Sequence, residues 1–354
     1  MKHLLAQLME GQPLSQDQAV EAFERIMSGQ ASPTQIAALL TLLAQRGPTV
    51  EELVGAAMVM RQKAARVEAP AGLRLIDTCG TGGDHAGTFN ISTAAAIIAA
   101  GAGWSQGVAV AKHGNRSVTS SSGSSQALEV LGVKLQVSPA TQRRCLEEAG
   151  VCFCFAPAHH PAMKHAAAVR TELGFRTIFN LVGPLTNPAG AKRQVVGVFA
   201  SRLTPLIASA LERLGAEEAM VVHGQIPSDG RHVDGLDELS TAGPSQVSHV
   251  QEGQIRTYEV DPTTLGLPFS HPSALRVADP AASGAMIRQI LAGQHGPARD
   301  IACLNAAAAL VVAGLASDLA EGVERAAEAI DRGAAQQALD KLIAITQADG
   351  NGKG

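Results

Sequence analysis

The sequence predicts an α/β fold with a small helical domain in front of a larger domain that contains a mostly parallel sheet. Short apolar runs alternate with Ala-rich helical segments over most of the chain, which is typical of parallel strands joined by right-handed crossovers. The first 65 or so residues show only helical periodicity and capping signals. Hydrophobic residues make up 46% of the 354 residues and aromatic residues only 3%, so Ala, Leu, Val and Ile must form the core.

The N-terminal region predicts three capped helices. Residues 15–18 form a capping box, and 32–35 combine a Ser cap with Pro at the first helical position and Gln at the third. One apolar face follows at Ile36, Leu39, Leu40 and Leu43. Residues 49–52 open a third helix, and the turn at 69–72 marks a domain boundary.

The remaining chain alternates between strands and helices. The strands are expected at 73–76, 108–111, 133–137, 151–155, 195–198 and 219–222. The helices are expected at 93–102, 127–131, 139–149, 163–170, 205–214 and within 300–345. This order places the loops that follow the strands at one edge of the sheet.

Composition excludes several classes of protein. The chain has 28 Lys and Arg against 32 Asp and Glu, a net charge of −4, where a dedicated nucleic-acid binder carries a basic excess. With one Trp and one Tyr, an aromatic platform for base stacking is not expected. The longest apolar stretches, 94–104 and 306–316, are shorter than the roughly 18–20 residues that span a bilayer. We therefore expect no nucleic-acid partner and no membrane segment.

Cysteine usage predicts a cytoplasmic protein without a zinc site. The five Cys are odd in number and scattered, and no signal-peptide core follows Met1, so reduced thiols are expected. Cys152 and Cys154 lie near His159 and His160, a set that could suggest zinc. The cysteines lie on an apolar strand without a second Cys pair, which favours a structural role.

The loop after the first strand is the strongest chemical signal. It reads Asp77-Thr78-Cys79-Gly80-Thr81-Gly82-Gly83-Asp84 and lies between a strand and a helix. Its glycines allow backbone N–H groups to approach an anion, although a plain tight turn explains them as well. No Walker lysine or dinucleotide fingerprint is present. Residues 90–93 then open the helix, as an ordinary cap or as ligand contacts.

A second polar loop follows the second strand. Residues 112–116 supply two cations, an imidazole and an amide, and a Ser/Gly run at 117–125 leads into a helix. The run is short and lies between a strand and a helix, so we interpret it as an oxyanion-binding loop in preference to a linker. Both loops would share one crevice and could hold a ligand with two phosphate groups. His113 could be a general acid or base, or a hydrogen-bonding loop residue.

Two further features depend on this crevice for their interpretation. The pair Asp237-Glu238 suits Mg²⁺, which takes one or two carboxylates and completes its shell with water and phosphate. A solvated acidic turn is the alternative. Arg170, on an expected helix, could clamp a carboxylate, but spacing alone favours a surface arginine.

Taken in order, these residues resemble the anthranilate phosphoribosyltransferase family. The matching stretches are 80–84, 90–93, 112–116 with the Ser run, 176–188 and 237–238, and the resemblance covers nearly the whole chain. It implies a homodimer in a nucleoside phosphorylase/phosphoribosyltransferase-like fold, unlike the Rossmann type. It also implies a helical domain of 1–68 plus about 162–182, for dimerisation and part of the anthranilate site. An α/β domain of 69–161 plus 183–354 would bind phosphoribosyl pyrophosphate.

The resemblance also implies a reaction and a site. Anthranilate and 5-phosphoribosyl 1-pyrophosphate would give N-(5′-phosphoribosyl)anthranilate and pyrophosphate, in tryptophan biosynthesis. The expected phosphoribosyl pyrophosphate contacts are Gly80, Gly83, Asp84, Thr88, Asn90, Ile91, Ser92, Thr93, Lys112, His113, Gly114, Asn115, Arg116, Ser117, Ser120 and Ser124. Ser92, Asp237 and Glu238 would hold Mg²⁺, and Gly80, Asn115 and Arg170 would contact anthranilate. The expected catalytic residues are Lys112, which would neutralise the leaving group, and His113, whose role stays open.

The sequence departs from the family pattern at several points. Ser121 stands where Lys is frequent, Gln126 where Asp is usual and Ala168 where Pro is frequent, and residues 225–234 form a longer insert. Two alternatives remain. A pyrimidine nucleoside phosphorylase of the same fold would use phosphate and need no Asp-Glu pair. A nucleic-acid-binding relative without activity would conflict with the intact loops and the negative charge.

Overall fold

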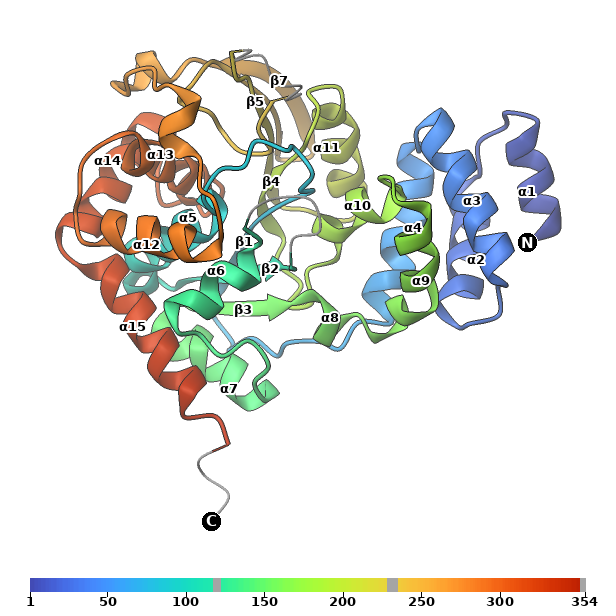
Figure 1. Cartoon of the computed structure of the whole chain (residues 1–354), viewed down its shortest axis with the longest axis horizontal. Coiled ribbons are helices and arrows are strands. Elements are labelled where there is room, and N and C mark those ends of the chain that lie inside the picture. Colours follow the sequence, from blue (N-terminus) through green and yellow to red (C-terminus); the bar gives the residue numbers. More distant parts are fainter. Residues whose placement is uncertain (117–121, 228–234, 351–354) are drawn as a thin grey trace.

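The computed structural model describes residues 1–116, 122–227 and 235–350. Figure 1 shows a group of N-terminal helices beside a larger unit in which helices surround a sheet. The C-terminal helix runs along the side of the larger unit that lies far from the N-terminus. Within the described residues, no helix has the length and apolar character that crossing a membrane requires.

The N-terminal helices form where the capping signals predict them. They are α1 (Lys2–Met9), α2 (Gln16–Met27), α3 (Pro33–Arg46) and α4 (Val50–Gln62). Ser15, Ser32 and Thr49 each accept a hydrogen bond from the backbone N–H three residues on, and each closes a capping box. These local signals therefore fix where three of the four helices begin.

One seven-stranded sheet spans the described part of the larger unit. Its strands are β1 (Arg74–Gly80), β2 (Val108–Gly114), β3 (Val151–Phe155), β4 (Arg193–Gly197), β5 (Glu218–Gly224), β6 (Ser245–Gln251) and β7 (Gln254–Val260). The order is β3-β2-β1-β4-β5-β6-β7, with β1 to β5 parallel and β6 and β7 antiparallel. The predicted mostly parallel sheet is confirmed. Parallel strands align their carboxyl ends, so the loops after β1, β2, β4 and β5 meet at one edge.

Helices cover the faces of this sheet (Figure 1). They are α5 (Ile91–Gly103), α6 (Ser124–Leu131), α7 (Pro139–Arg144), α8 (Ala156–His159), α11 (Leu203–Arg213), α12 (Pro280–Leu291), α13 (Pro297–Val312), α14 (Leu319–Asp331) and α15 (Ala334–Gln347). Short turns of helix lie at Trp104–Gln106, Cys145–Ala149, Pro161–Met163, Gly183–Thr186, Pro262–Leu265 and Pro272–Leu275. A Cβ atom on Gly101 of α5 would lie 2.5 Å from the backbone nitrogen of Ala335. The close packing of α5 against the start of α15 thus explains a glycine at this position.

One strand prediction is wrong, and one pair of strands was not predicted. Residues 133–137 pair with no strand in the described part of the chain, although Val133 and Leu135 are buried and Lys134 between them is exposed. The segment connects α6 to α7, and its Lys134 N–H donates to Thr346 Oγ1 (3.2 Å). The hairpin of β6 and β7 was missed, because its strands are rich in polar residues and β7 is exposed along most of its length.

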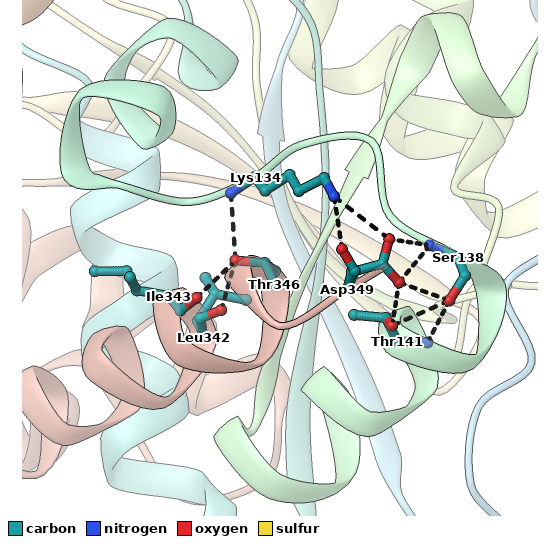
Figure 2. Close-up of polar contacts among 7 residues, drawn as sticks. All are labelled: Lys134, Ser138, Thr141, Leu342, Ile343, Thr346 and Asp349. Carbon is teal, nitrogen blue, oxygen red and sulfur yellow. Dashed lines mark hydrogen bonds and ion pairs between the residues drawn. The ribbon is translucent and has the colours of Figure 1, made fainter. Parts of the chain in front are cut away.

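The C-terminal end of α15 is fixed to the start of α7 by Asp349 (Figure 2). Its carboxylate accepts hydrogen bonds from the backbone N–H of Ser138 (3.2 Å), from Ser138 Oγ (2.9 Å) and from Thr141 Oγ1. Lys134 Nζ donates to the Asp349 backbone carbonyl (2.8 Å). Hydrogen bonds from Thr141 and Ser138 lower the pKa of Asp349, so the carboxylate stays charged.

Helices α9 (Lys164–Leu173) and α10 (Ile178–Val182) pack against the N-terminal helices (Figure 1). Ala166, Val169 and Phe179 share a hydrophobic core with α1 to α4, and the rings of Phe23 and Phe179 meet edge to face at 5.6 Å. This core continues onto the face of the sheet that α11 covers. The division into 1–68 plus about 162–182 and 69–161 plus 183–354 stays a prediction.

Candidate active site

The site lies where β1, β4 and β5 end in glycine. A Cβ atom on Gly80 would lie 2.4 Å from Asp237 Oδ2, and one on Gly197 would lie 1.5 Å from the Asp237 carbonyl oxygen. On Gly224 it would lie 2.6 Å from the Glu238 carbonyl oxygen. Three adjacent strand ends therefore lack side chains, so that the Asp237-Glu238 segment can lie directly over them.

Two of these glycines, Gly197 and Gly224, were not predicted as site residues. Gly197 lies inside an apolar run and Gly224 follows His223, so neither glycine carries a clear local signal. The contact that explains them is distant in sequence. Gly224 pairs with Leu236, and their backbone groups exchange hydrogen bonds of 2.9 and 2.8 Å. Residues 228–234 of the insert lie outside the described residues, but its return at Leu236 is fixed by this pair.

The Gly-rich loop turns sharply over the end of β1. Gly82 and Gly83 have φ values of +65° and +80°, and His85 has +59°. Such positive values favour glycine, and successive ones turn backbone N–H groups toward a common point. The Gly82 N–H donates to Asp237 Oδ2 (2.8 Å), and the Thr81 N–H donates to the Gly197 carbonyl (2.9 Å). The loop and the acidic pair therefore meet.

Residues 88–93 position the start of α5 beside this loop. Asn90 caps the helix, with its Oδ1 accepting from the Thr93 N–H (3.1 Å), so the capping interpretation is confirmed. The Ser92 N–H donates to Glu238 Oε1 (3.0 Å), which brings the predicted metal ligands Ser92 and Glu238 together. Thr88 forms an isolated bridge with Arg276, and Ile91 is buried in the core.

Lys112 is a buried lysine on β2 whose amino group points toward the end of β1 and the start of α5. The strand β2 extends to Gly114, three residues beyond the predicted end, so this lysine belongs to the sheet and not to a loop. Only 2% of it is exposed, and its Nζ donates to the Thr78 carbonyl and to Ser92 Oγ (3.0 Å). Burial lowers its pKa, while nearby Asp77 opposes that effect. A positive charge thus lies next to the strand ends.

Asp77 and Asn187 brace the same strands and were not predicted as site residues. Asp77 Oδ1 accepts from the His113 N–H (3.0 Å), and Oδ2 accepts from Asn187 Nδ2 (2.7 Å). The same Asn187 amide donates to the Ala111 carbonyl (2.7 Å). Burial raises the pKa of Asp77. A signal was available, since Asn187 lies in the matching stretch 176–188 and Asp77 begins the Gly-rich segment 77–84.

His113 packs against a second histidine behind the strand ends. Its Nε2 lies 3.2 Å from His160 Nε2, and both rings are buried. Burial lowers the pKa of His113 to about 3 and that of His160 to about 4. Both imidazoles are therefore uncharged at neutral pH. His113 can form hydrogen bonds in this form but adds no positive charge to the site.

The histidine next to this pair has a structural role. His159 Nδ1 is hydrogen-bonded to the Ala65 carbonyl (2.7 Å), and its Nε2 is hydrogen-bonded to Gln142 Nε2 (2.8 Å). Both ring nitrogens are thus occupied by protein partners. Among the described residues, no three His, Cys, Asp or Glu side chains gather to hold a metal ion. A magnesium site here would therefore use two carboxylates and depend on water and phosphate for its other ligands.

The acidic pair fits a divalent cation in its charge and its donors. Burial raises the pKa of Asp237 well above its ordinary value, and the nearby Asp84 carboxylate raises it further. Burial also raises the pKa of Glu238 to about 7, although Lys112 opposes the shift. Carboxylate and hydroxyl oxygens are the ligands that Mg²⁺ prefers, and a cation would stabilise the ionised forms. The residues present therefore suit this ion.

The second loop is described only in part. Ser124 Oγ donates to the Asn115 carbonyl (3.3 Å). Gly114 leaves space for the Ser124 hydroxyl, since a Cβ atom on Gly114 would lie 2.3 Å from Ser124 Oγ. Arg116 forms an exposed ion pair with Glu129 on α6 (3.0 Å). Ser117 and Ser120 lie outside the described residues, as does Ser121.

Arg170 lies on α9, on the helical side of the site. Its guanidinium lies 5.4 Å from the centre of the Phe179 ring, and burial lowers its pKa. Among the described residues, its side chain makes no hydrogen bond or ion pair. The structure therefore does not join Arg170 to the strand-end cluster, but it leaves a half-buried cation without an anionic partner.

The arrangement defines a class of protein. A family model described as the a/b domain of a glycosyl transferase family matches residues 72–336, and one described as its helical bundle domain matches residues 2–64. These matches cover most of the chain and confirm the two-part α/β fold. The protein is a glycosyltransferase.

The relatives make the assignment specific. The chain is 51% identical over 345 residues to anthranilate phosphoribosyltransferase of Rhodospirillum rubrum, with 98% of this chain and 95% of the relative covered. It is 48% identical to the enzyme of Rubrobacter xylanophilus, with 98% of each covered. The chain belongs to the anthranilate phosphoribosyltransferase family.

Solved structures agree with this assignment. Anthranilate phosphoribosyltransferase from Thermus thermophilus matches with a TM-score of 0.88 and 40% identity, over 98% of this chain and 99% of that chain. The Saccharomyces cerevisiae enzyme in complex with PRPP and Mg matches with a TM-score of 0.86 and 28% identity, over 98% and 97%. A further yeast structure, with a TM-score of 0.84 and 26% identity, contains 4-fluoroanthranilate.

Proposed function

We propose that this protein transfers the phosphoribosyl group of 5-phosphoribosyl 1-pyrophosphate to anthranilate. The products are N-(5′-phosphoribosyl)anthranilate and pyrophosphate, and the reaction belongs to tryptophan biosynthesis. One observation carries the proposal: Asp237 and Glu238 lie over three glycine strand ends, beside the Gly-rich loop and Lys112. Acidic ligands, backbone donors and a fixed cation are the groups that a pyrophosphate leaving group requires.

Phosphoribosyl pyrophosphate is bound at the edge of the sheet in this proposal. Backbone donors come from the Gly-rich loop and the start of α5, and cationic side chains come from Lys112 on β2 and from Arg116 after it. The contacts are Gly80, Gly83, Asp84, Thr88, Asn90, Ile91, Ser92, Thr93, Lys112, Gly114, Asn115, Arg116 and Ser124, with Ser117 and Ser120 beyond the described residues. The Gly82 N–H already donates to a carboxylate oxygen of Asp237, which supports a loop that receives anionic oxygens.

Ser92, Asp237 and Glu238 would hold Mg²⁺ in this proposal. The ion would add positive charge to the pyrophosphate oxygens as the bond to the sugar breaks. Lys112 holds its ammonium group at the same place, next to Ser92 Oγ. Asp84 lies close enough to Asp237 to raise its pKa, and its own Oδ1 accepts from the Ala86 N–H (3.1 Å).

Anthranilate is placed between the helical segment and the strand ends. Arg170 supports this position because its guanidinium is half-buried and has no anionic partner among the described residues. A fork of N–H donors suits a carboxylate. Gly80 and Asn115 complete the contacts on the sheet side. Few aromatic residues are available, so charge and aliphatic packing would hold the ring.

The chemistry follows from this placement. The transition state is oxocarbenium-like, as in other glycosyl transfers, and the pyrophosphate departs with its charge neutralised. The aromatic amine is already a nucleophile, so alignment with the sugar carbon supplies much of the acceleration. Lys112 acts on the leaving group. His113 is the second proposed catalytic residue, and its uncharged imidazole can take part in hydrogen bonds.

We also propose a cytoplasmic homodimer. All five cysteines are buried and free, which agrees with a reducing compartment. The family resemblance supports the dimer, with the helical region of 1–68 plus about 162–182 as its interface.

The experiment follows anthranilate fluorescence with pure protein, phosphoribosyl pyrophosphate and Mg²⁺. Loss of fluorescence that requires all three additions supports the proposal. No loss, together with Mg²⁺-independent phosphorolysis of a pyrimidine nucleoside, would replace it with the phosphorylase alternative. Gel filtration with light scattering tests the dimer separately.

A further inference from the structure

Arg176 lies in the short connection between α9 and α10, yet its side chain contacts two loops of the sheet. Its Nη1 donates to the Gly83 carbonyl at 2.8 Å, and its guanidinium carbon lies 4.1 Å from the centre of the Phe199 ring. Gly83 is 93 positions away in the sequence. The Arg176 side chain is exposed, so these contacts are not a consequence of packing in a core.

The two loops that Arg176 contacts are already bonded to each other. Phe199 follows β4, and its N–H donates to Thr81 Oγ1 (3.2 Å) in the Gly-rich loop. The Thr81 N–H in turn donates to the Gly197 carbonyl (2.9 Å) at the end of β4. Arg176 adds a third segment to this pair. A planar guanidinium can stack on a ring and donate from its edge at once, which an ammonium group cannot do.

The contact acts on the least constrained part of the loop. Gly82 and Gly83 carry no side chains to fix their positive φ values, and glycine loses more conformational freedom than any other residue when it is ordered. The Gly82 N–H is held by Asp237, whereas the Gly83 carbonyl is held by Arg176. In a trans peptide the carbonyl and the following N–H point in opposite directions. Fixing the Gly83 carbonyl therefore also fixes the direction of the Asp84 N–H.

We propose that Arg176 is a positioning residue that presets the Gly-rich loop to receive phosphoribosyl pyrophosphate. It also ties the loop to the helical segment that carries Arg170, so the two sides of the site are joined through one side chain. This inference rests on the proposed function. Its effect is on the binding of the phosphorylated substrate more than on the chemical step, because Arg176 acts through the loop backbone.

The test compares Arg176→Ala, Arg176→Lys and Phe199→Leu with the wild type. Arg143→Ala is the matched control, since Arg143 is an exposed helical arginine that pairs with Glu147 four residues on. Hydrogen exchange is measured over residues 80–89 without substrates, and KM and kcat are measured for both substrates. We expect Arg176→Ala to speed exchange in 80–89 and to raise the phosphoribosyl pyrophosphate KM about tenfold, with kcat changed less than about threefold.

The substitutions separate the two contacts. Arg176→Lys and Phe199→Leu should each give a smaller rise in KM, since each keeps one contact, and Arg143→Ala should give none. Unchanged exchange and unchanged KM in Arg176→Ala would overturn the inference, as would equal rises in both substrate KM values. Melting temperatures identify a variant that fails to fold. If Arg176→Ala fails to fold, the exchange rates and KM values of Arg176→Lys test the inference in its place. If the wild type shows no turnover, the proposed function fails, but the exchange measurement still decides the role of Arg176 in the loop.

Discussion

The carboxylate of Asp237 accepts a hydrogen bond from the backbone N–H of Gly82 at 2.8 Å. This contact joins the acidic pair to the Gly-rich loop across 155 positions of sequence. It depends on three strands that end in glycine, because side chains at Gly80, Gly197 or Gly224 would occupy the space of the acidic segment. The site is therefore formed by several segments that meet at the edge of the sheet, and not by any single sequence motif.

Gly197→Ala should damage the site through its backbone. The new Cβ atom would lie 1.5 Å from the Asp237 carbonyl oxygen, so the acidic segment must move. We expect a loss of at least about 2 kcal/mol in the free energy of unfolding, and a raised Mg²⁺ requirement. Chemical denaturation and a Mg²⁺ titration of turnover measure the two effects. Gly183→Ala is the folding control, since its Cβ would meet nothing within 4 Å, and wild-type behaviour of Gly197→Ala would contradict the packing argument.

Replacing the acidic pair should weaken the use of Mg²⁺. Asp237→Asn with Glu238→Gln keeps the shape of both side chains but removes the two carboxyl groups that can ionise to bind the metal. We expect the Mg²⁺ concentration for half-maximal turnover to rise about tenfold or more. The control is Asp340→Asn, an exposed position on α15. An unchanged Mg²⁺ titration of the double variant would rule out metal ligation by this pair.

Arg170→Ala should affect one substrate more than the other. The guanidinium lies on α9, on the helical side, and has no anionic partner among the described residues. Removing it should raise the anthranilate KM about tenfold, with a smaller change in the phosphoribosyl pyrophosphate KM. Steady-state kinetics with each substrate varied in turn gives both values. Equal rises would refute the assignment of Arg170 to the anthranilate carboxylate.

The buried pair of His113 and His160 should lower the stability of the fold as the pH falls from about 6.5 toward 5, while Glu238, whose pKa is raised to about 7, contributes in the opposite direction. The pKa of His113 is about 3 and that of His160 about 4 in the folded chain, against 6.5 for an ordinary histidine. The unfolded chain therefore binds protons in this window that the folded chain excludes, and each such proton costs at most about 1.4 kcal/mol per pH unit. Above pH 6.5 both histidines are uncharged in the folded and the unfolded chain, so neither changes the free energy of unfolding with pH.

Denaturant unfolding at several pH values measures this dependence. Between pH 6.5 and 5, His160→Gln should lose less free energy of unfolding than the wild type. The reason is that it removes one of the two histidines that bind a proton only in the unfolded chain. An equal slope in the wild type and His160→Gln would show that the pair does not titrate as its burial implies.

Local rules explain what the sequence could predict. Ser15, Ser32 and Thr49 cap helices because each cap depends on residues within one turn. The parallel sheet follows from the alternation of strands and helices. The family resemblance supplied the candidate site residues, since Arg170 and Asp237 carry no decisive signal in their own spacing.

Long-range contacts explain what the sequence could not predict. Lys112 and His113 are polar, so the predicted strand stopped before them, although both are buried within β2. Val133 and Leu135 alternate in burial like a strand, but no strand among the residues that the structure describes lies beside them to pair with. Gly197 and Arg176 acquire their roles only from partners many residues away.

The central claim is that the acidic pair and the two loops at the strand ends form a Mg²⁺-dependent phosphoribosyl transfer site. The most direct measurement is the stoichiometry of the reaction: pyrophosphate released and anthranilate consumed, with pure protein, before and after a chelator is added. The account predicts one pyrophosphate for each anthranilate, and no release once the metal is removed. Pyrophosphate release that is independent of anthranilate, or no release at all, would contradict it.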